Sequence, residues 1–236
     1  MKKMITGVAA VALLVAPAAF AADVDVTVDV ASAYVFRGDT LNDGPVVQPG
    51  LEVGLPYGLT VGVWGNFDLD DYDGALEKNQ FSEIDVYVSY ALPVELLDIS
   101  IGYTEYTYPG AEGKADREIG IAFGYDLDLF EVGLGVFYGV DGGIDKQLFA
   151  ELTVGTSYEL AEDVSLDLGA GVGYLNPDEG KSGFSGYSLS AGVSYGVLGA
   201  SVTYYGQIND DVLVDVEDGG TYDVDVVGML SLALAF

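Results

Sequence analysis

The sequence predicts an all-β fold, a single transmembrane antiparallel up-and-down β-barrel of about twelve strands, with short periplasmic turns and longer extracellular loops. Three observations predict it. Apolar and polar side chains alternate along segments of roughly ten residues, the connections alternate between short and long, and aromatic residues gather near the segment ends. A tilted strand of roughly ten residues can cross the hydrocarbon layer. A soluble sandwich has no reason to alternate its connection lengths, so the pattern favours a barrel.

The N-terminal residues have the features of a secretory signal peptide. Two lysines precede a short apolar run, and Ala19 and Ala21 have the A-x-A spacing of a cleavage site. The run is too short to cross a bilayer as a helix. We therefore expect residues 1–21 to be removed and residues 22–236 to form the barrel in the bacterial outer membrane. A retained N-terminal anchor is the alternative.

The composition is both apolar and strongly acidic. Half of the 236 residues are hydrophobic and the formal net charge is −30, with a mean hydropathy of +0.32. A barrel in lipid can display apolar side chains outward, whereas a soluble protein must bury them. Cysteine is absent, which excludes a disulfide framework, and the acidic balance gives no basis for binding nucleic acid.

Histidine is also absent, which bears on catalysis. Lipase-type or protease-type chemistry on this scaffold normally needs a general base, most often histidine. No serine–lysine arrangement stands out, and the paired acids are better explained as lining of a lumen. We expect neither enzymatic activity nor a cofactor.

The alternation defines the strand segments and their closure into a barrel. The predicted segments are 23–36, 46–55, 58–67, 82–91, 97–107, 117–126, 129–139, 147–158, 163–174, 186–196, 198–206 and 223–236. Every backbone polar group in lipid must be paired, so the first and last segments are expected to pair with each other. Pro49 removes a hydrogen-bond donor from the second segment, and we expect a bulge there near the extracellular rim.

The connections and the aromatic residues agree on the orientation of the segments. The longer, polar connections are 37–45, 68–81, 108–116, 140–146, 175–185 and 207–222. Aromatic rings predicted to face outward lie at both ends of the segments. At the long-loop end they are Tyr34, Phe36, Phe67, Tyr103, Tyr138, Tyr174, Tyr187 and Tyr204, and at the short-turn end Tyr90, Tyr125, Phe130, Tyr158, Tyr195 and Phe236. Such rings favour headgroup depth, which predicts two girdles.

The residues predicted to face inward are mainly acidic or small. The candidates for the lumen or its constriction are Arg37, Glu52, Trp64, Glu83, Asp85, Tyr87, Glu118, Glu131 and Glu151. Carboxylates are not buried without partners, and only Arg37, Arg117 and Lys146 lie near the barrel as counter-charges. The sequence therefore favours a porin that passes small solutes or ions through a wet, cation-preferring lumen.

The alternative is a non-conducting structural or surface-interaction barrel with acidic, cation-binding loops. Its lumen would be plugged by aromatic residues, namely Trp64, Tyr87, Tyr106, Phe137, Phe149 and Tyr205. Asp68, Asp70, Asp71 and Asp73 are candidate ligands for a hard cation. Their spacing does not follow the EF-hand order, and a solvated acidic surface is the other interpretation.

Four stretches near the N-terminus resemble a known family. Residues 32–38, Ser-Ala-Tyr-Val-Phe-Arg-Gly, followed by Asp-Gly-Pro-Val-Val-Gln at 43–48, resemble the opening motif of the TorF-type porins, a family of conserved hypothetical outer-membrane proteins. Residues 62–66 and 83–87 look like its next two blocks, so the resemblance reaches about residue 90. The family more often has glycine where this chain has Pro49. The resemblance implies an outer-membrane channel, and it names no solute and no binding residues.

The same resemblance and the terminal strand suggest partners. Phe236, on an alternating last segment, is similar to the signal that the barrel-assembly machinery reads. The other expected partners are outer-membrane lipid and small solutes or cations. No outward patch specifies an oligomer.

Arg37 is the most specific candidate in the opening motif. We expect Tyr34 and Phe36 to face the lipid interface and Arg37 to turn inward, pairing with an acid near the rim such as Glu83 or Asp85. This pair would shape the constriction, so Arg37→Ala should raise conductance or strengthen cation preference. The alternative is that Arg37 only satisfies carbonyl groups at the rim.

Overall fold

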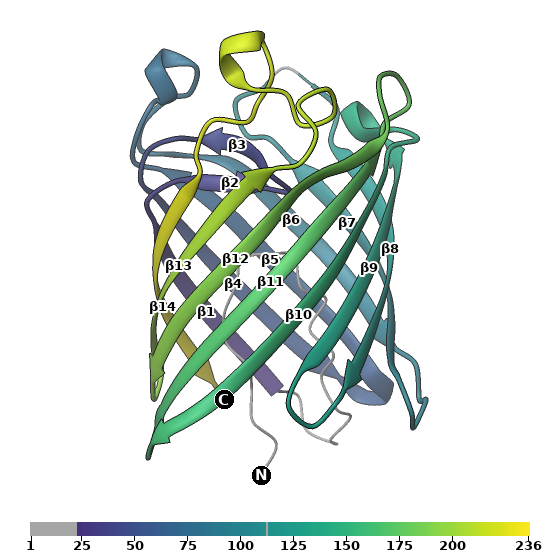
Figure 1. Cartoon of the computed structure of the whole chain (residues 1–236), viewed down its shortest axis with the longest axis vertical. Coiled ribbons are helices and arrows are strands. Elements are labelled where there is room, and N and C mark those ends of the chain that lie inside the picture. Colours follow the sequence, from purple (N-terminus) through teal and green to yellow (C-terminus); the bar gives the residue numbers. More distant parts are fainter. Residues whose placement is uncertain (1–22, 112) are drawn as a thin grey trace.

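The computed structural model describes residues 23–111 and 113–236, and the predicted signal peptide therefore lies outside the described residues. Within the described residues, twelve strands form one closed antiparallel barrel (Figure 1). They are β1 (Asp23–Ala31), β4 (Val46–Leu55), β5 (Leu59–Asp68), β6 (Gln80–Ala91), β7 (Asp98–Thr107), β8 (Asp116–Asp126), β9 (Glu131–Asp141), β10 (Leu148–Ala161), β11 (Val164–Asn176), β12 (Gly183–Tyr195), β13 (Leu198–Gln207) and β14 (Val226–Ala235). The all-β class and the strand number are confirmed.

The barrel has an up-and-down order in which each strand pairs with the next one along the chain. The ring closes where β1 pairs with β14, with Val28 opposite Leu232. On its other side β1 pairs with β4, with Thr27 opposite Gly50. The predicted pairing of the first and last segments is therefore confirmed, and it leaves no open sheet edge.

The strand register sorts the side chains onto two faces. Residues opposite each other in neighbouring strands lie on the same face, and successive residues alternate between faces. Valine and leucine dominate the outer face, where Leu152 and Leu230 are 50% and 63% exposed. On the inner face, Glu52 lies opposite Asp25, and Trp64 lies opposite Asp85. The wall is thus apolar outside and polar inside, as a barrel in lipid requires.

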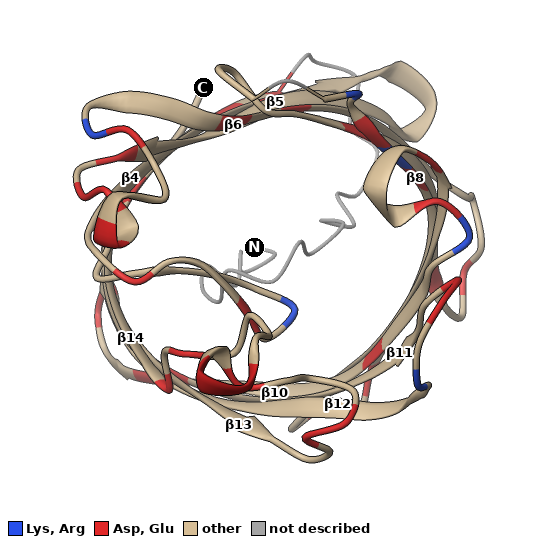
Figure 2. Ribbon diagram, turned by 90° about the horizontal axis from the view of Figure 1, so that it is seen from above, with Lys and Arg blue, Asp and Glu red and all other residues tan. Residues whose placement is uncertain are grey.

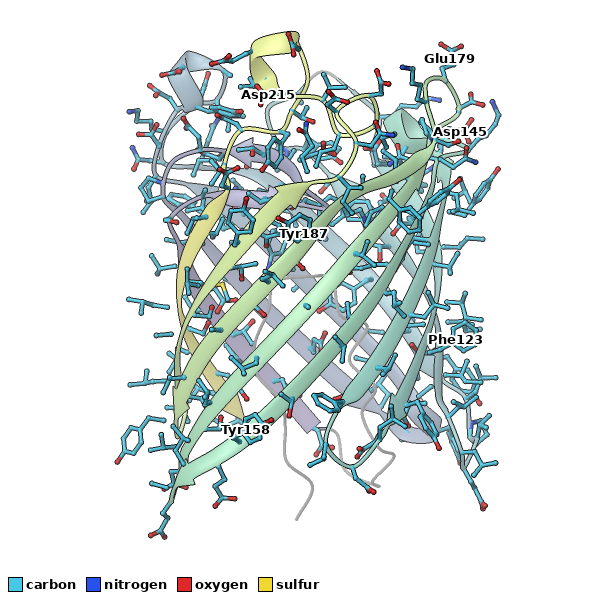
Figure 3. The ribbon with its side chains drawn as sticks, in the orientation of Figure 1. Phe123, Asp145, Tyr158, Glu179, Tyr187 and Asp215 are labelled. Atoms are coloured by element: carbon cyan, nitrogen blue, oxygen red, sulfur yellow. The ribbon has the colours of Figure 1, made fainter. Side chains whose placement is uncertain are left out.

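The outward aromatic side chains lie at the two ends of this wall. Figure 3 shows Tyr158 at the short-turn end of the barrel and Tyr187 close to the long loops. The exposed rings of Tyr125 and Tyr195 share the end of Tyr158, and Tyr204 shares the end of Tyr187. These positions correspond to the two girdles expected of a barrel that crosses a membrane.

The connections alternate in length around the ring, with the long ones at one end (Figure 1). Short 3-10 helices lie in some of these connections, namely η1 (Pro56–Gly58), η2 (Tyr72–Gly74), η3 (Gly142–Ile144) and η4 (Val216–Asp218). No helix in the described part of the chain is long and apolar enough to cross a membrane. We call the long-loop end of the barrel its mouth.

The first predicted segment was too long. β1 ends at Ala31, the chain bends at residues 32–33, and β2 (Tyr34–Phe36) and β3 (Asp39–Asn42) form a separate two-stranded sheet. We call β2, β3 and their turn the inward hairpin. Its turn has Arg37 at φ +57° and Gly38 at φ +98°, the left-handed region that glycine tolerates best. The sequence alternation continues past the bend, although the barrel strand itself does not.

The predicted bulge at Pro49 is also wrong. Val47 pairs with Phe67 and Gly50 pairs with Trp64, so the register between β4 and β5 is the same on both sides of Pro49. The pairing is only interrupted there, and the side chain of Gln48 instead donates a hydrogen bond to Asn66 at 3.0 Å. A side-chain contact thus replaces part of the backbone ladder that proline interrupts.

Candidate functional site

The inward hairpin lies inside the mouth of the barrel. Seen from above, a segment from the β4 side of the wall enters the ring beside the loop that follows β13 (Figure 2). Along its length the hairpin contacts successive strands of the inner wall. Tyr34 packs against Trp64 of β5 with 5.5 Å between ring centroids, and Phe36 packs against Tyr106 of β7 at 6.0 Å. The prediction that Tyr34 and Phe36 face the lipid is therefore wrong, because the chain folds inward after Ala31.

The tip of the hairpin is fixed by an ion pair. The Arg37 guanidinium donates two hydrogen bonds to the Glu118 carboxylate of β8, at 2.8 and 2.9 Å. The Tyr106 hydroxyl donates a third hydrogen bond to the same carboxylate at 3.0 Å. The side chains of Arg37 and Glu118 are only 11% and 4% exposed. A bidentate, nearly buried ion pair of this kind is strong and geometrically specific.

Three aromatic rings surround the same guanidinium. The Arg37 Cζ atom lies 4.7 Å from the ring centroids of Phe36 and Phe137, and 4.6 Å from that of Phe149. At this distance the ring faces attract a cation, more strongly when water is excluded. Burial lowers the pKa of Arg37, but the hydrogen bonds and charge of Glu118 outweigh this effect and raise it above its usual value. Arg37 is therefore a fixed positive charge at this place.

The predicted partner of Arg37 was wrong. Arg37 pairs with Glu118, whereas Glu83 and Asp85 lie on β6, where Glu83 makes side-chain hydrogen bonds with Tyr34 and with Asp85. The partner is set by how far the hairpin extends along the inner wall. The hairpin extends past β6 and β7, so its tip meets β8, β9 and β10, while its base faces β6.

A long loop holds the other side of the hairpin. This closing loop, residues 208–225, receives a hydrogen bond at the Thr221 carbonyl from the Thr40 backbone N–H at 2.8 Å. The Thr40 hydroxyl oxygen accepts hydrogen bonds from the backbone N–H groups of Asp223 and Val224 at 3.2 and 3.0 Å. The Thr221 hydroxyl donates to the Asp39 carboxylate. Wall and loop thus hold the hairpin from both sides.

The base of the hairpin is fixed by a buried polar network. The side-chain amides of Asn42 and Asn66 both donate to Asp68 Oδ1, at 2.7 and 2.9 Å. All three residues are completely buried. Asp68 is therefore part of a buried hydrogen-bond network that supports the base of the hairpin.

The four aspartates considered as metal ligands do not converge on one site. Asp70 and Asp71 each lie 3.3 Å from the Lys78 ammonium, and the hydrogen bond to Lys78 lowers the pKa of Asp70. Asp73 lies in η2. Within residues 23–111 and 113–236, no group of three or more acidic residues has an arrangement that could hold a metal ion.

The remaining lumen candidates lie on the inner face but not all at one place. The Tyr87 hydroxyl donates to Glu52 at 2.7 Å, in a contact between β6 and β4. Glu151 lines a cavity beside Arg37. Glu131 begins β9 at the opposite, short-turn end of the barrel, so it does not belong to the group at the mouth.

The two other predicted counter-charges do not face the lumen. Arg117 neighbours Glu118 in β8 and therefore points to the other face, where it binds Glu105 at 3.0 Å and Asp141 at 2.9 Å. Lys146 binds Asp178 between two loops. Among the described residues, no lysine or arginine lies on the inner face of a barrel strand.

Sequence reasoning missed the role of the hairpin. Thr40 and Asn42 gave no signal, because small polar residues are common in loops. The available signal was the Arg37-Gly38 pair in a long first connection, since glycine after a charged residue favours a tight turn. Phe137 and Phe149 were considered only as plugging residues, and the structure places them around Arg37.

These features define a porin-like β-barrel with a hairpin folded into its mouth. The chain belongs to the family described as "Bacterial protein of unknown function (Gcw_chp)", whose model matches residues 15–188. No curated protein matches the sequence significantly.

Similar solved structures support the fold. The KdgM porin in complex with disordered oligogalacturonate has a TM-score of 0.51 and 8% identity, over 91% of this chain and 98% of that one. The COG4313 outer membrane channel from Pseudomonas putida F1 has a TM-score of 0.51 and 11% identity, over 94% and 97% of the two chains. NanC porin has a TM-score of 0.47 and 11% identity, over 91% and 98%. The likeness to the KdgM porin and to the COG4313 channel shows the barrel fold alone, because the identities are low.

Proposed function

We propose that this protein is an outer-membrane channel that passes small cationic or neutral solutes and whose mouth is narrowed by the inward hairpin. The observation that carries the proposal is the charge of the inner wall. The inward acids of its barrel strands include Asp25, Asp29, Glu52, Glu83, Asp85, Asp98, Glu118, Glu131, Glu151 and Asp167. Among the described residues, the basic side chain that lies inside the mouth is that of Arg37 in the hairpin, and it is already paired with Glu118.

This charge distribution favours cations over anions. A lumen lined by one sign of charge concentrates the opposite ions and repels ions of its own sign. The oligogalacturonate in the KdgM complex is a polyanion. The inward carboxylates of this chain would oppose the entry of such a polyanion.

The membrane assignment is part of the same proposal. The exposed apolar outer face, the aromatic residues at both ends and the closed ring are the features of an outer-membrane barrel. We further propose that Phe236, which is 76% exposed after β14, is read by the barrel-assembly machinery. The sequence resemblance to TorF-type porins also supports a channel.

The test is single-channel recording of the refolded protein, lacking residues 1–21, in a planar bilayer under a KCl gradient. We expect discrete conductance steps and a reversal potential that shows cation preference. Arg37→Ala should raise the conductance, because it removes the guanidinium that fixes the hairpin tip to Glu118 inside the mouth. Unchanged conductance and selectivity in this variant would contradict the proposal that the inward hairpin narrows the mouth.

The same recording decides between the two candidate functions. The hairpin and the closing loop cover part of the mouth, and this observation favours a non-conducting, surface-interacting barrel as the second candidate. Silence from a protein shown by circular dichroism to be folded would support the second candidate. A preference for anions would be consistent with a channel, but it would refute the proposal that the inward acids select cations.

A further inference from the structure

A small cavity lies beside the Arg37–Glu118 pair, on the side of the closing loop. Its volume is about 60 Å³, and its walls include Phe36, Phe149, Glu151, Ser185 and Tyr205. By the same measure one water molecule needs about 10–15 Å³, so the cavity has room for a small polar group together with water. Leu213 of the closing loop forms part of its wall.

Glycines create this space. A Cβ atom on Gly173 would lie 3.0 Å from the Ser185 hydroxyl oxygen and 3.1 Å from the Phe149 ring. A Cβ atom on Gly171 would lie 2.8 Å from the Ser188 hydroxyl oxygen and 3.1 Å from Glu151 Oε1. Any larger residue on this face of β11 would therefore fill the cavity or displace its polar groups.

Two polar groups of the cavity wall lack partners. The Ser185 Oγ atom is buried, in a side chain only 2% exposed, and has no hydrogen-bond partner in the described structure. The Glu151 carboxylate makes no hydrogen bond or ion pair within residues 23–111 and 113–236, because the guanidinium of Arg37 is bound by Glu118 and acts on Glu151 only through its charge. Buried polar groups are normally satisfied, so the Ser185 hydroxyl, together with the Glu151 carboxylate in the same cavity wall, points to an occupant.

The charges around the cavity favour a monovalent cation. Arg37 also lines the cavity, but its charge is compensated by the bidentate pair with Glu118, so the Glu151 carboxylate has only the more distant attraction of Arg37 and no ion-pair partner of its own in the described part of the chain. A hard divalent cation needs six or more oxygen ligands, and the described residues offer no group of three acids for one. Aromatic rings and hydroxyl groups are instead suited to an organic ammonium ion, which makes hydrogen bonds and cation–π contacts.

We propose that this cavity binds the primary ammonium group of a small solute. Glu151 supplies the counter-charge, the hydroxyl groups of Ser185 and Ser188 accept N–H hydrogen bonds, and the rings of Phe149 and Tyr205 enclose the group. The inference rests on the proposed channel function and deepens it, because it names a class of solute held beside the constriction.

The test is binding of methylammonium to the refolded protein in detergent micelles, followed by saturation-transfer NMR of the methyl protons. We expect saturable binding with a Kd in the millimolar range, as is usual for so small a ligand. Glu151→Gln and Gly173→Ala should each weaken binding about tenfold or more, the first by removing the charge and the second by filling the space. Tetramethylammonium, which has no N–H donor, should not compete.

Asp167→Asn is the matched control, because it removes one inward charge from β11 without touching the cavity, and it should bind methylammonium like the wild type. No saturable binding, equal binding by Glu151→Gln, or equal competition by potassium would each overturn the proposal. The outcome is separable from channel activity. Binding by a protein that does not conduct would refute only the channel, and conduction without binding would refute only this site.

Discussion

Glu118→Gln isolates the contribution of the ion pair that holds the hairpin tip. The substitution keeps the shape of the side chain but leaves the Arg37 guanidinium, 11% exposed, without a counter-charge. Removing one partner of a buried pair costs about 3–5 kcal/mol, and we take the lower end because one hydrogen bond to the glutamine oxygen can persist. A loss of about 3 kcal/mol lowers the ratio of docked to undocked hairpin roughly a hundredfold.

The assay is hydrogen exchange at the Thr40 amide, which donates to the Thr221 carbonyl only when the hairpin is docked. Where exchange requires undocking, Glu118→Gln should speed it roughly a hundredfold. Glu105→Gln is the matched control, because its ion pair with Arg117 is 36–42% exposed and is expected to contribute less than about 1 kcal/mol. Thr40 exchange within about threefold of the wild-type rate in Glu118→Gln would refute the reasoning.

Three further predictions test the faces of the wall, its packing and the pH dependence of docking. Leu152→Arg places a charge on the lipid-facing side and should lower barrel stability by about 2–4 kcal/mol, as measured by urea unfolding from lipid vesicles. Thr153→Arg, on the inner face, should change the stability little, and equal losses in the two variants would contradict the assigned faces. Gly62→Ala places a Cβ atom 2.3 Å from the Tyr87 ring and should cost about 1–3 kcal/mol, so an unchanged midpoint of thermal unfolding would show that the ring moves freely. Burial raises the pKa of Asp39 above 3.8, so the docked hairpin binds this proton more tightly. Docking should therefore be strongest below the ordinary pKa and weaken as the pH rises through the raised one, as followed by amide exchange corrected for its intrinsic rate; Asp39→Asn should abolish this dependence, and its persistence would assign it to another group.

The barrel was predictable because its signals are local. Alternation with period two identifies a strand with two different faces, and the short and long connections set the direction of successive strands. Both signals need only neighbouring residues. The pairing of β1 with β14 then follows from the requirement that no backbone group stays unpaired in lipid.

The hairpin was not predictable in the same way because its position depends on distant residues. Alternation alone makes Tyr34 and Phe36 look like outward residues of β1, and only the contacts with Trp64 and Tyr106 show that they lie inside. The partner of Arg37 is set by how far the hairpin reaches around the wall. At Pro49, proline predicts an interrupted ladder, but whether a bulge follows depends on the register of the whole strand.

The contact between the hairpin and the closing loop also constrains the order of assembly. Asp223 and Thr40 are 183 positions apart, and the loop that carries Asp223 leads directly into β14. Loop-closure entropy makes such distant contacts late events in folding, so the hairpin can reach its final position only after the other strands have formed. A hairpin held from both sides therefore requires the complete chain, because a chain that stops short of its last strand leaves one edge of β1 unpaired and the hairpin held by the barrel wall alone.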